Sequence, residues 1–179
     1  MIQRVQSILL FLSALLMLTF LFVPIWQGSN NPRAVEGKSF DGKATLDAFT
    51  LKVEGIEKTS STSEASIEKT ENRKAEETNM MYTAILAMAS VLMSLYTIFQ
   101  FKNRPLQIKL SMLNSLIIIG ALGCVFLGVR EGKSFLPSLQ NDDFLIGFYL
   151  PVVALVSNVF AVRMIRKDEK LVKSADRFR

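Results

Sequence analysis

Residues 80–101 read MMYTAILAMASVLMSLYTIFQF, a run without a single charged side chain. An α-helix rises about 1.5 Å per residue, so about 20 apolar residues cross the hydrocarbon core of a bilayer, which is about 30 Å thick. Three other uncharged runs reach or approach that length: Val5 to Trp26, Leu110 to Val129 and Phe144 to Val162. These four runs predict an all-α integral membrane protein.

The predicted fold is an antiparallel four-helix transmembrane bundle, which makes a single membrane domain of residues 1–179. Pro24 and Trp26 are interpreted as the end of the first helix at the membrane interface, where indole rings prefer to lie. Arg163 extends the fourth helix, because a long basic side chain can reach the headgroups. The predicted spans cover residues 5–26, 80–101, 110–129 and 144–165, with a larger outer loop at 27–79 and a basic tail at 166–179.

Lysine and arginine residues next to the spans predict which side of the membrane each segment faces, because cytoplasmic segments retain them. The tail is basic, and so are the N-terminus and the connector between the second and third spans, through Arg4, Lys102, Arg104 and Lys109. Residues 27–79 and 130–143 have more acidic than basic side chains. We therefore expect a multi-pass protein with both termini in the cytoplasm. The net charge of +5 then reflects membrane orientation, so nucleic acid is not an expected partner.

Ionisable and nucleophilic groups are scarce where a membrane enzyme or transporter would need them. The chain contains no histidine and one cysteine, Cys124 in the third span. Coupled transporters and proton pumps usually place charged side chains within the membrane, and none of the four spans has one. Nucleotide-binding, zinc and nucleophile-elbow motifs are also absent from the sequence. We expect no enzyme activity, no catalytic residue, no cofactor and no metal.

The outer loop at 27–79 divides by composition into two parts. Phe49, Leu51 and Val53 alternate with polar residues, which predicts a short β-hairpin resting on the bundle. The polar stretch that follows is expected to be a flexible linker up to about Ser66 and then a helical extension into the second span. At the other connector, the side chains of 141–143 are expected to cap the fourth helix.

Polar side chains inside the spans seek partners, because hydrocarbon offers them none. Under the predicted orientation they cluster near the cytoplasmic leaflet. We expect a hydrogen-bonded network that fixes helix register and includes an Asn114–Asn158 contact; a ligand site is the alternative. The residues assigned to this network are Gln6, Gln100, Asn114 and Asn158.

Small residues at four-residue spacing favour close helix contacts in lipid. Gly120, Cys124 and Gly128 form such a ridge on the third span. We interpret it as a packing surface within the bundle, with dimerisation as the alternative.

The tail has the spacing of a basic amphipathic helix that leaves the membrane. Its cations are expected to contact anionic headgroups along the membrane surface, with an acidic partner as the alternative. The residues assigned to lipid or partner contact are Arg163, Arg166, Lys167, Lys170, Lys173, Arg177 and Arg179.

Three segments carry a family resemblance. They are MIQRVQS at residues 1–7, FKNRPLQIKL at 101–110 and RKDEKLVKSADR at 166–177. With these segments the chain resembles a family of small four-span bacterial inner-membrane proteins that is catalogued only as a domain of unknown function. The resemblance implies a location in the bacterial inner (cytoplasmic) membrane and supplies no residue roles.

Two functions are consistent with this pattern. The first is a non-enzymatic accessory or scaffold subunit of a larger inner-membrane complex, whose partners would be the lipid bilayer and other membrane protein subunits. The alternative is a small-molecule channel or carrier that acts as an oligomer.

Overall fold

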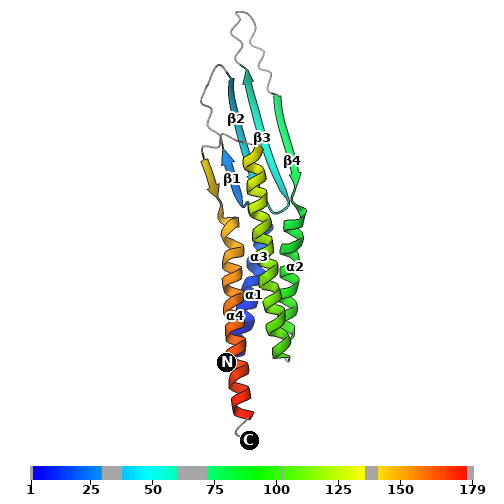
Figure 1. The fold of residues 1–179 in the computed structure, drawn as a ribbon, viewed down its shortest axis with the longest axis vertical. Helices are drawn as coiled ribbons and strands as arrows, with labels where there is room; N and C mark the ends of the chain where they lie inside the picture. Colours follow the sequence, from blue (N-terminus) through cyan, green and yellow to red (C-terminus); the bar gives the residue numbers. More distant parts are fainter. Residues whose placement is uncertain (1, 30–37, 60–71, 102, 136–140, 177–179) are drawn as a thin grey trace, which may run out of the picture.

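The computed structural model describes residues 2–29, 38–59, 72–101, 103–135 and 141–176. Within these ranges the helices are α1 (Ile2–Phe20), α2 (Met81–Phe99), α3 (Arg104–Phe135) and α4 (Ile146–Asp176). The strands are β1 (Trp26–Ser29), β2 (Lys38–Leu46), β3 (Thr50–Thr59), β4 (Asn72–Asn79) and β5 (Asn141–Phe144). The fold is mostly helical, and a sheet stands on one end of the helices (Figure 1).

The four helices pack in a ring and alternate in direction. Helix α1 contacts α2 and α4, and α3 contacts the same two helices. The N- and C-termini lie at the end of the bundle away from the sheet (Figure 1). Both termini are therefore on the same side of the molecule.

A heptad pattern of buried positions explains why the helices pack lengthwise. On α3 eight buried positions follow alternating steps of four and three, namely 107, 111, 114, 118, 121, 125, 128 and 132, and Val129 is buried beside them. A step of 3.5 residues keeps one seam of a helix facing its neighbours, as in a left-handed coiled coil.

The distribution of side chains in the bundle is that of a membrane protein. Large apolar side chains face outward: Leu116 is 64% exposed and Leu92 61%. By contrast, Ser94 and Asn114 inside the bundle are fully buried. Helices α2, α3 and α4 are long and apolar enough to cross a membrane, and the apolar part of α1, Val5–Phe20, is shorter.

The sheet has five strands in the order β4-β3-β2-β1-β5, and all neighbours are antiparallel. The predicted hairpin was too small, although β3 does contain Leu51 and Val53. The predicted helical extension before α2 was also wrong, because residues 72–79 form β4. Residues 141–143 likewise belong to β5, where they pair with β1 rather than cap α4. The predicted linker lies mostly outside the described residues.

Backbone hydrogen bonds extend the sheet into the segments that join α1 to β1 and β5 to α4. The amide of Ile25 donates to the carbonyl of Leu46 at 2.8 Å, and the amide of Leu145 donates to Ile25 at 3.0 Å. Helix α1 ends at Phe20, earlier than predicted. Trp26 lies in β1 and has no exposed surface. A buried apolar cluster continues from Met17 in the bundle to Leu51 in the sheet.

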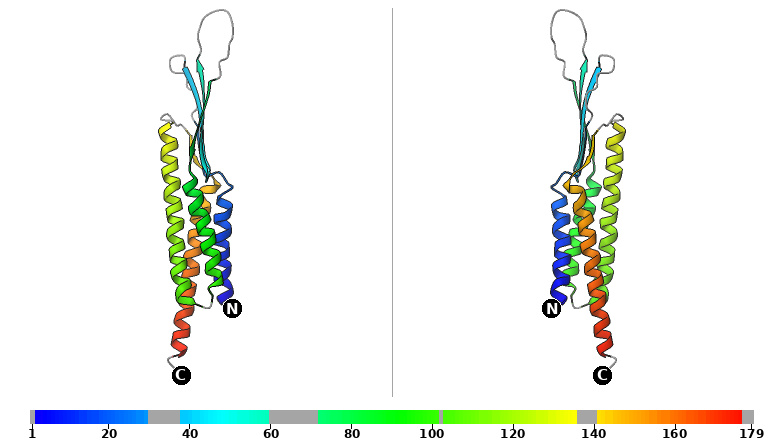
Figure 2. Two further views of the ribbon diagram at one scale, coloured as in Figure 1. Left: turned by 90° about the vertical axis from the view of Figure 1, so that its right-hand side faces the viewer. Right: turned by 90° about the vertical axis from the view of Figure 1, so that its left-hand side faces the viewer.

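Helix α3 runs past the bundle and lies against one face of the sheet, while no other described helix covers the opposite face (Figure 2). Its 32 residues make it about 48 Å long, more than the predicted span at 110–129 and more than the bilayer core of about 30 Å. Helix α4 begins at Ile146 and continues past the bundle at the other end, as far as Asp176.

Candidate functional site

A cluster of neutral polar side chains occupies the half of the bundle that is away from the sheet, and we call it the polar core. Asn114 on α3 is its first centre. The hydroxyl of Ser90 donates to Asn114 Oδ1 at 2.8 Å, and Asn114 Nδ2 donates to the Ser94 hydroxyl at 2.9 Å. All three side chains are fully buried, so one asparagine holds two turns of α2 against α3.

Asn158 on α4 is the second centre. Its Nδ2 donates to the carbonyl of Ser111 and to the hydroxyl of Ser115, both at 2.8 Å. The neighbouring Ser157 hydroxyl donates to the carbonyl of Leu9 on α1 at 3.0 Å. Two adjacent residues of α4 therefore bind α3 and α1, respectively.

The polar core differs in membership from the predicted network. Asn114 and Asn158 bond to different serines rather than to each other. Gln100 lies at the exposed end of α2, where its Nε2 donates to the Tyr96 hydroxyl. Gln6 is buried, and its Nε2 has no hydrogen-bond partner among the described residues. Sequence reasoning missed Ser111 and Ser157, although Ser111 lies at four- and three-residue spacing from Gln107 and Asn114 on α3.

The side chains of the polar core can exchange hydrogen bonds but carry no charge at neutral pH, because they are serines and asparagines. Within the described ranges, moreover, no three histidine, cysteine or acidic side chains come together to hold a metal ion. The hydrogen bonds of the polar core therefore support a structural role, in which they hold the helices in register.

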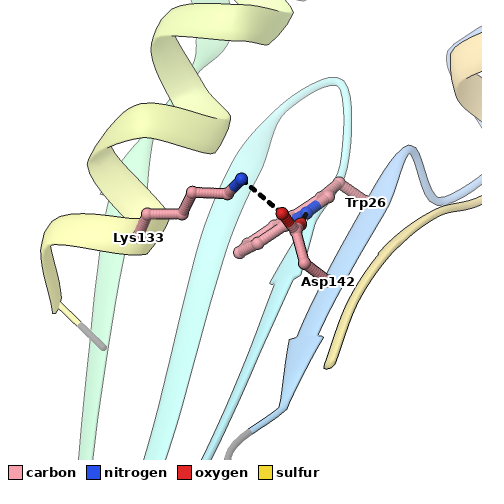
Figure 3. Close-up of polar contacts among 3 residues, drawn as sticks. All are labelled: Trp26, Lys133 and Asp142. Atoms are coloured by element: carbon pink, nitrogen blue, oxygen red, sulfur yellow. Dashed lines mark hydrogen bonds and ion pairs between the residues drawn. The ribbon is translucent and has the colours of Figure 1, made fainter. Parts of the chain in front are cut away.

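A second polar group, which we call the sheet clamp, joins the projecting end of α3 to the sheet (Figure 3). Trp26 Nε1 donates to Asp142 Oδ1, and Lys133 Nζ forms an ion pair with Asp142 Oδ2. The three residues come from β1, β5 and α3. Gly132, next to Lys133, lets the Trp26 ring pack directly on the backbone of α3. A Cβ atom at position 132 would lie only 2.8 Å from Trp26 Cζ3.

Electrostatics at the sheet clamp favour the ionised form of Asp142. Burial raises the pKa of this carboxyl, but the hydrogen bonds from Lys133 and Trp26 and the charge of Lys133 outweigh that effect. The net result is a pKa below the ordinary value of 3.8. The ion pair is therefore intact at neutral pH.

Basic side chains gather at the opposite end of the molecule. Arg104, at the start of α3, pairs with Asp168 on α4 at 2.8 Å. Arg166 Nη2 lies 3.0 Å from Met112 Sδ on α3, and the Arg163 guanidinium lies 5.9 Å from the centre of the Phe160 ring. Of the other residues assigned to contact, Lys167 and Lys170 are exposed, whereas Arg177 and Arg179 lie outside the described residues.

Comparison with protein families finds one match over nearly the whole length. A model described as a domain of unknown function (DUF4293) matches residues 2–178. The chain belongs to this family. A search of curated proteins finds no match to the chain.

In this DUF4293 chain the small residues of α3 divide between two environments. Gly128 is buried, and a Cβ there would lie 3.0 Å from Leu46 of the sheet. Gly120 is exposed, with only Leu86 within 4 Å of such a Cβ. Cys124 is partly buried. On α3, Gly128 and Gly132 are thus the glycines that let side chains of the sheet approach the helix backbone closely. Sequence reasoning missed Gly132 because it placed that residue in a loop.

Replacing Asn114 with leucine should lower the free energy of unfolding of this DUF4293 chain by about 1–2 kcal/mol, because Ser90 and Ser94 would lose their shared partner. Reversible unfolding in mixed detergent micelles measures the difference. Gln100→Leu, at the exposed end of α2, is the matched control and should change the value by less than about 0.5 kcal/mol. Equal effects of the two changes would contradict the role assigned to Asn114.

The Asp142 carboxylate should stabilise the fold at neutral pH and lose this effect in acid. Its pKa is lower in the folded chain than in the unfolded one, so the stabilisation is present above about pH 5 and disappears as pH falls below 3.8. The measurement is the stability difference between the wild type and Asp142→Asn across this range. Asp143→Asn, on the opposite face of β5, is the control. A difference that persists unchanged at low pH would contradict the prediction.

Proposed function

We propose that this chain is a non-enzymatic, four-span protein of the bacterial inner membrane that serves as an accessory or scaffold subunit of a larger membrane complex. One observation carries the proposal: a single apolar core runs from Met17 in the bundle through Trp26 to Leu51 in the sheet. A core without a break holds the sheet at a fixed position relative to the helices. Such a rigid projecting sheet suits a subunit that presents a surface to partners.

The neighbours of α1 and its exposed apolar side chains support placing this helix in the membrane as well. Its apolar part, Val5–Phe20, reaches about 24 Å, which is less than the hydrocarbon thickness of about 30 Å. It packs between α2 and α4 and exposes large apolar side chains such as Phe11 and Leu15. These contacts and exposed side chains support four spans, and the basic residues beside the termini support an orientation with the sheet outside the cytoplasm. Reporter fusions test the orientation: a fluorescent protein fused after Arg179 should be active, and alkaline phosphatase fused there should be inactive.

The exposed face of the sheet is the surface offered to a partner. Residues on this face carry alternating charges, as in the cross-strand pairs Lys43 with Glu54 and Lys52 with Glu77. Lys52 Nζ lies 4.0 Å from Glu77 Oε1. A polar face with both signs of charge is that of a solvated surface, and a partner on it would be selected by complementary charges rather than by apolar burial.

Cross-linking in native membranes followed by mass spectrometry tests the scaffold function. A stoichiometric larger partner is expected, and reversing the charge of Lys43 and Lys52 should remove its cross-links to the sheet. Gly123→Ala, which adds a methyl group into open space on α3, is the control and should leave them unchanged. Recovery of the chain without any stoichiometric partner would contradict the proposal.

The alternative function, a channel or carrier that acts as an oligomer, is favoured by one observation, the neutral polar core. Its hydroxyl and amide groups could solvate a small polar molecule. Solute flux through liposomes containing the purified chain tests this function. Flux that is reduced by Asn114→Leu would support the channel over the scaffold.

A further inference from the structure

Cations from two helices meet at the end of the bundle that carries the termini. On α4, Arg163, Arg166 and Lys167 are exposed and share one face, because they are spaced at three and four residues. On α3, Lys109 is exposed and lies one turn from Met112, the residue that Arg166 contacts. Arg166 therefore crosses the seam between α3 and α4 on the side where Lys109 lies.

Two acidic side chains, Asp168 and Glu169, lie in the same region of α4. Asp168 is two residues after Arg166, which places it about 200° further round the helix. Its side chain is only 18% exposed and is paired with Arg104. Glu169 also has a partner within the chain. Lys109, Arg163, Arg166 and Lys167 outnumber Asp168 and Glu169 here, and Asp168 is already paired with Arg104, so the region of the seam keeps a net positive charge.

Apolar side chains continue from these cations toward the sheet. Met112, Leu116 and Phe160 are 51%, 64% and 51% exposed, respectively, and belong to the same two helices. A molecule that fits both parts has a negatively charged head and long apolar chains. A soluble phosphate compound would leave the apolar part uncovered.

We propose that the α3–α4 seam binds the headgroup phosphate of an anionic phospholipid through Lys109 and Arg166, with the acyl chains lying along Met112, Leu116 and Phe160. The inference rests on the membrane insertion proposed above for α3 and α4. A basic site between membrane helices on the cytoplasmic side is a known way to hold such headgroups. An anionic lipid is preferred over a zwitterionic one because its phosphate charge is not offset within the same headgroup.

Native mass spectrometry of the full chain in detergent tests the site. Phosphatidylglycerol should remain bound at lower added concentration than phosphatidylcholine, which has the same phosphate but no net charge. The Lys109→Gln, Arg166→Gln double variant should weaken phosphatidylglycerol binding about 20-fold, because each cation near anionic headgroups contributes about a factor of five. The Lys43→Gln, Lys52→Gln double variant on the sheet removes the same charge and should bind like the wild type.

Three results of the lipid-binding measurements would overturn the lipid site. They are equal binding of the two lipids, unchanged binding by the Lys109 and Arg166 variant, and displacement of the lipid by inorganic phosphate. A variant that loses a co-purified protein but keeps its lipid would also overturn it, in favour of an acidic partner. Fluorescence of Trp26, the single tryptophan, reports whether each variant is folded. Carbonate extraction separates failure of the site from failure of membrane insertion, which would release the chain.

Discussion

Replacing Gly147 with alanine should lower the free energy of unfolding by about 3 kcal/mol. Gly147 lies in the first turn of α4, against the segment that leaves α1, and its amide donates to the Pro24 carbonyl at 3.2 Å. An added Cβ would lie 2.5 Å from that carbonyl oxygen and 2.8 Å from the Val23 oxygen. Both atoms are backbone, so no side-chain rotation can relieve the contact. The start of α4 would have to move away from α1.

Unfolding in mixed micelles of SDS and a mild detergent, followed by circular dichroism, measures this effect. Gly123→Ala and Gly120→Ala provide matched controls, because a Cβ meets no atom within 4 Å at Gly123 and only Leu86 at 3.9 Å at Gly120. Both should stay within about 0.5 kcal/mol of the wild type. A Gly147→Ala chain as stable as these two would show that α1 and α4 do not approach as closely as described.

Trp26→Ala should cost about 4 kcal/mol of stability, the second large effect. The indole ring has no exposed surface, is packed against Gly132 of α3, and donates to Asp142 of β5. Truncation to alanine would therefore leave a cavity between the end of α3 and the sheet. Because the variant has no other tryptophan, circular dichroism rather than fluorescence must follow its unfolding.

Phe49→Ala removes an aromatic ring that is 46% exposed and serves as the control for Trp26→Ala. Its cost should be much smaller. A further check uses Gly132→Ala, whose added Cβ would lie 2.8 Å from the Trp26 ring. Its cost should shrink when Trp26 is first replaced by the smaller phenylalanine, so the two changes should not be additive. Additive costs would contradict the packing of these residues against each other.

The helices were predictable from the sequence because length and absence of charge identify an apolar span directly, as at 80–101. The sheet was not, and Trp26 shows why. An aromatic residue after an apolar run is typical of a membrane interface, yet here the ring is buried between a strand and the end of α3. Strand β1 has four residues, and one of its partners, β5, begins more than 100 residues later. No local pattern contains that pairing.

The polar core was predictable in part. Asn114 and Asn158 stood out as amides within apolar runs, and the structure places both at hydrogen-bonding centres. Their partners are serines and a backbone carbonyl, and serine is common enough in membrane helices to carry little signal by itself. Gln100 was assigned to the network by its depth alone. Its side chain instead bonds Tyr96 of the same helix, because depth alone does not decide which residues meet.

Helix α3 belongs to two environments at once, since its first two-thirds lie in the bundle and its last turns support the sheet. One continuous helix therefore extends from the bundle to the sheet, without a break between them. A thinner membrane would increase hydrophobic mismatch, which helices accommodate by changing their tilt. The sheet would lean with α3, so membrane thickness would set the direction in which its polar face points.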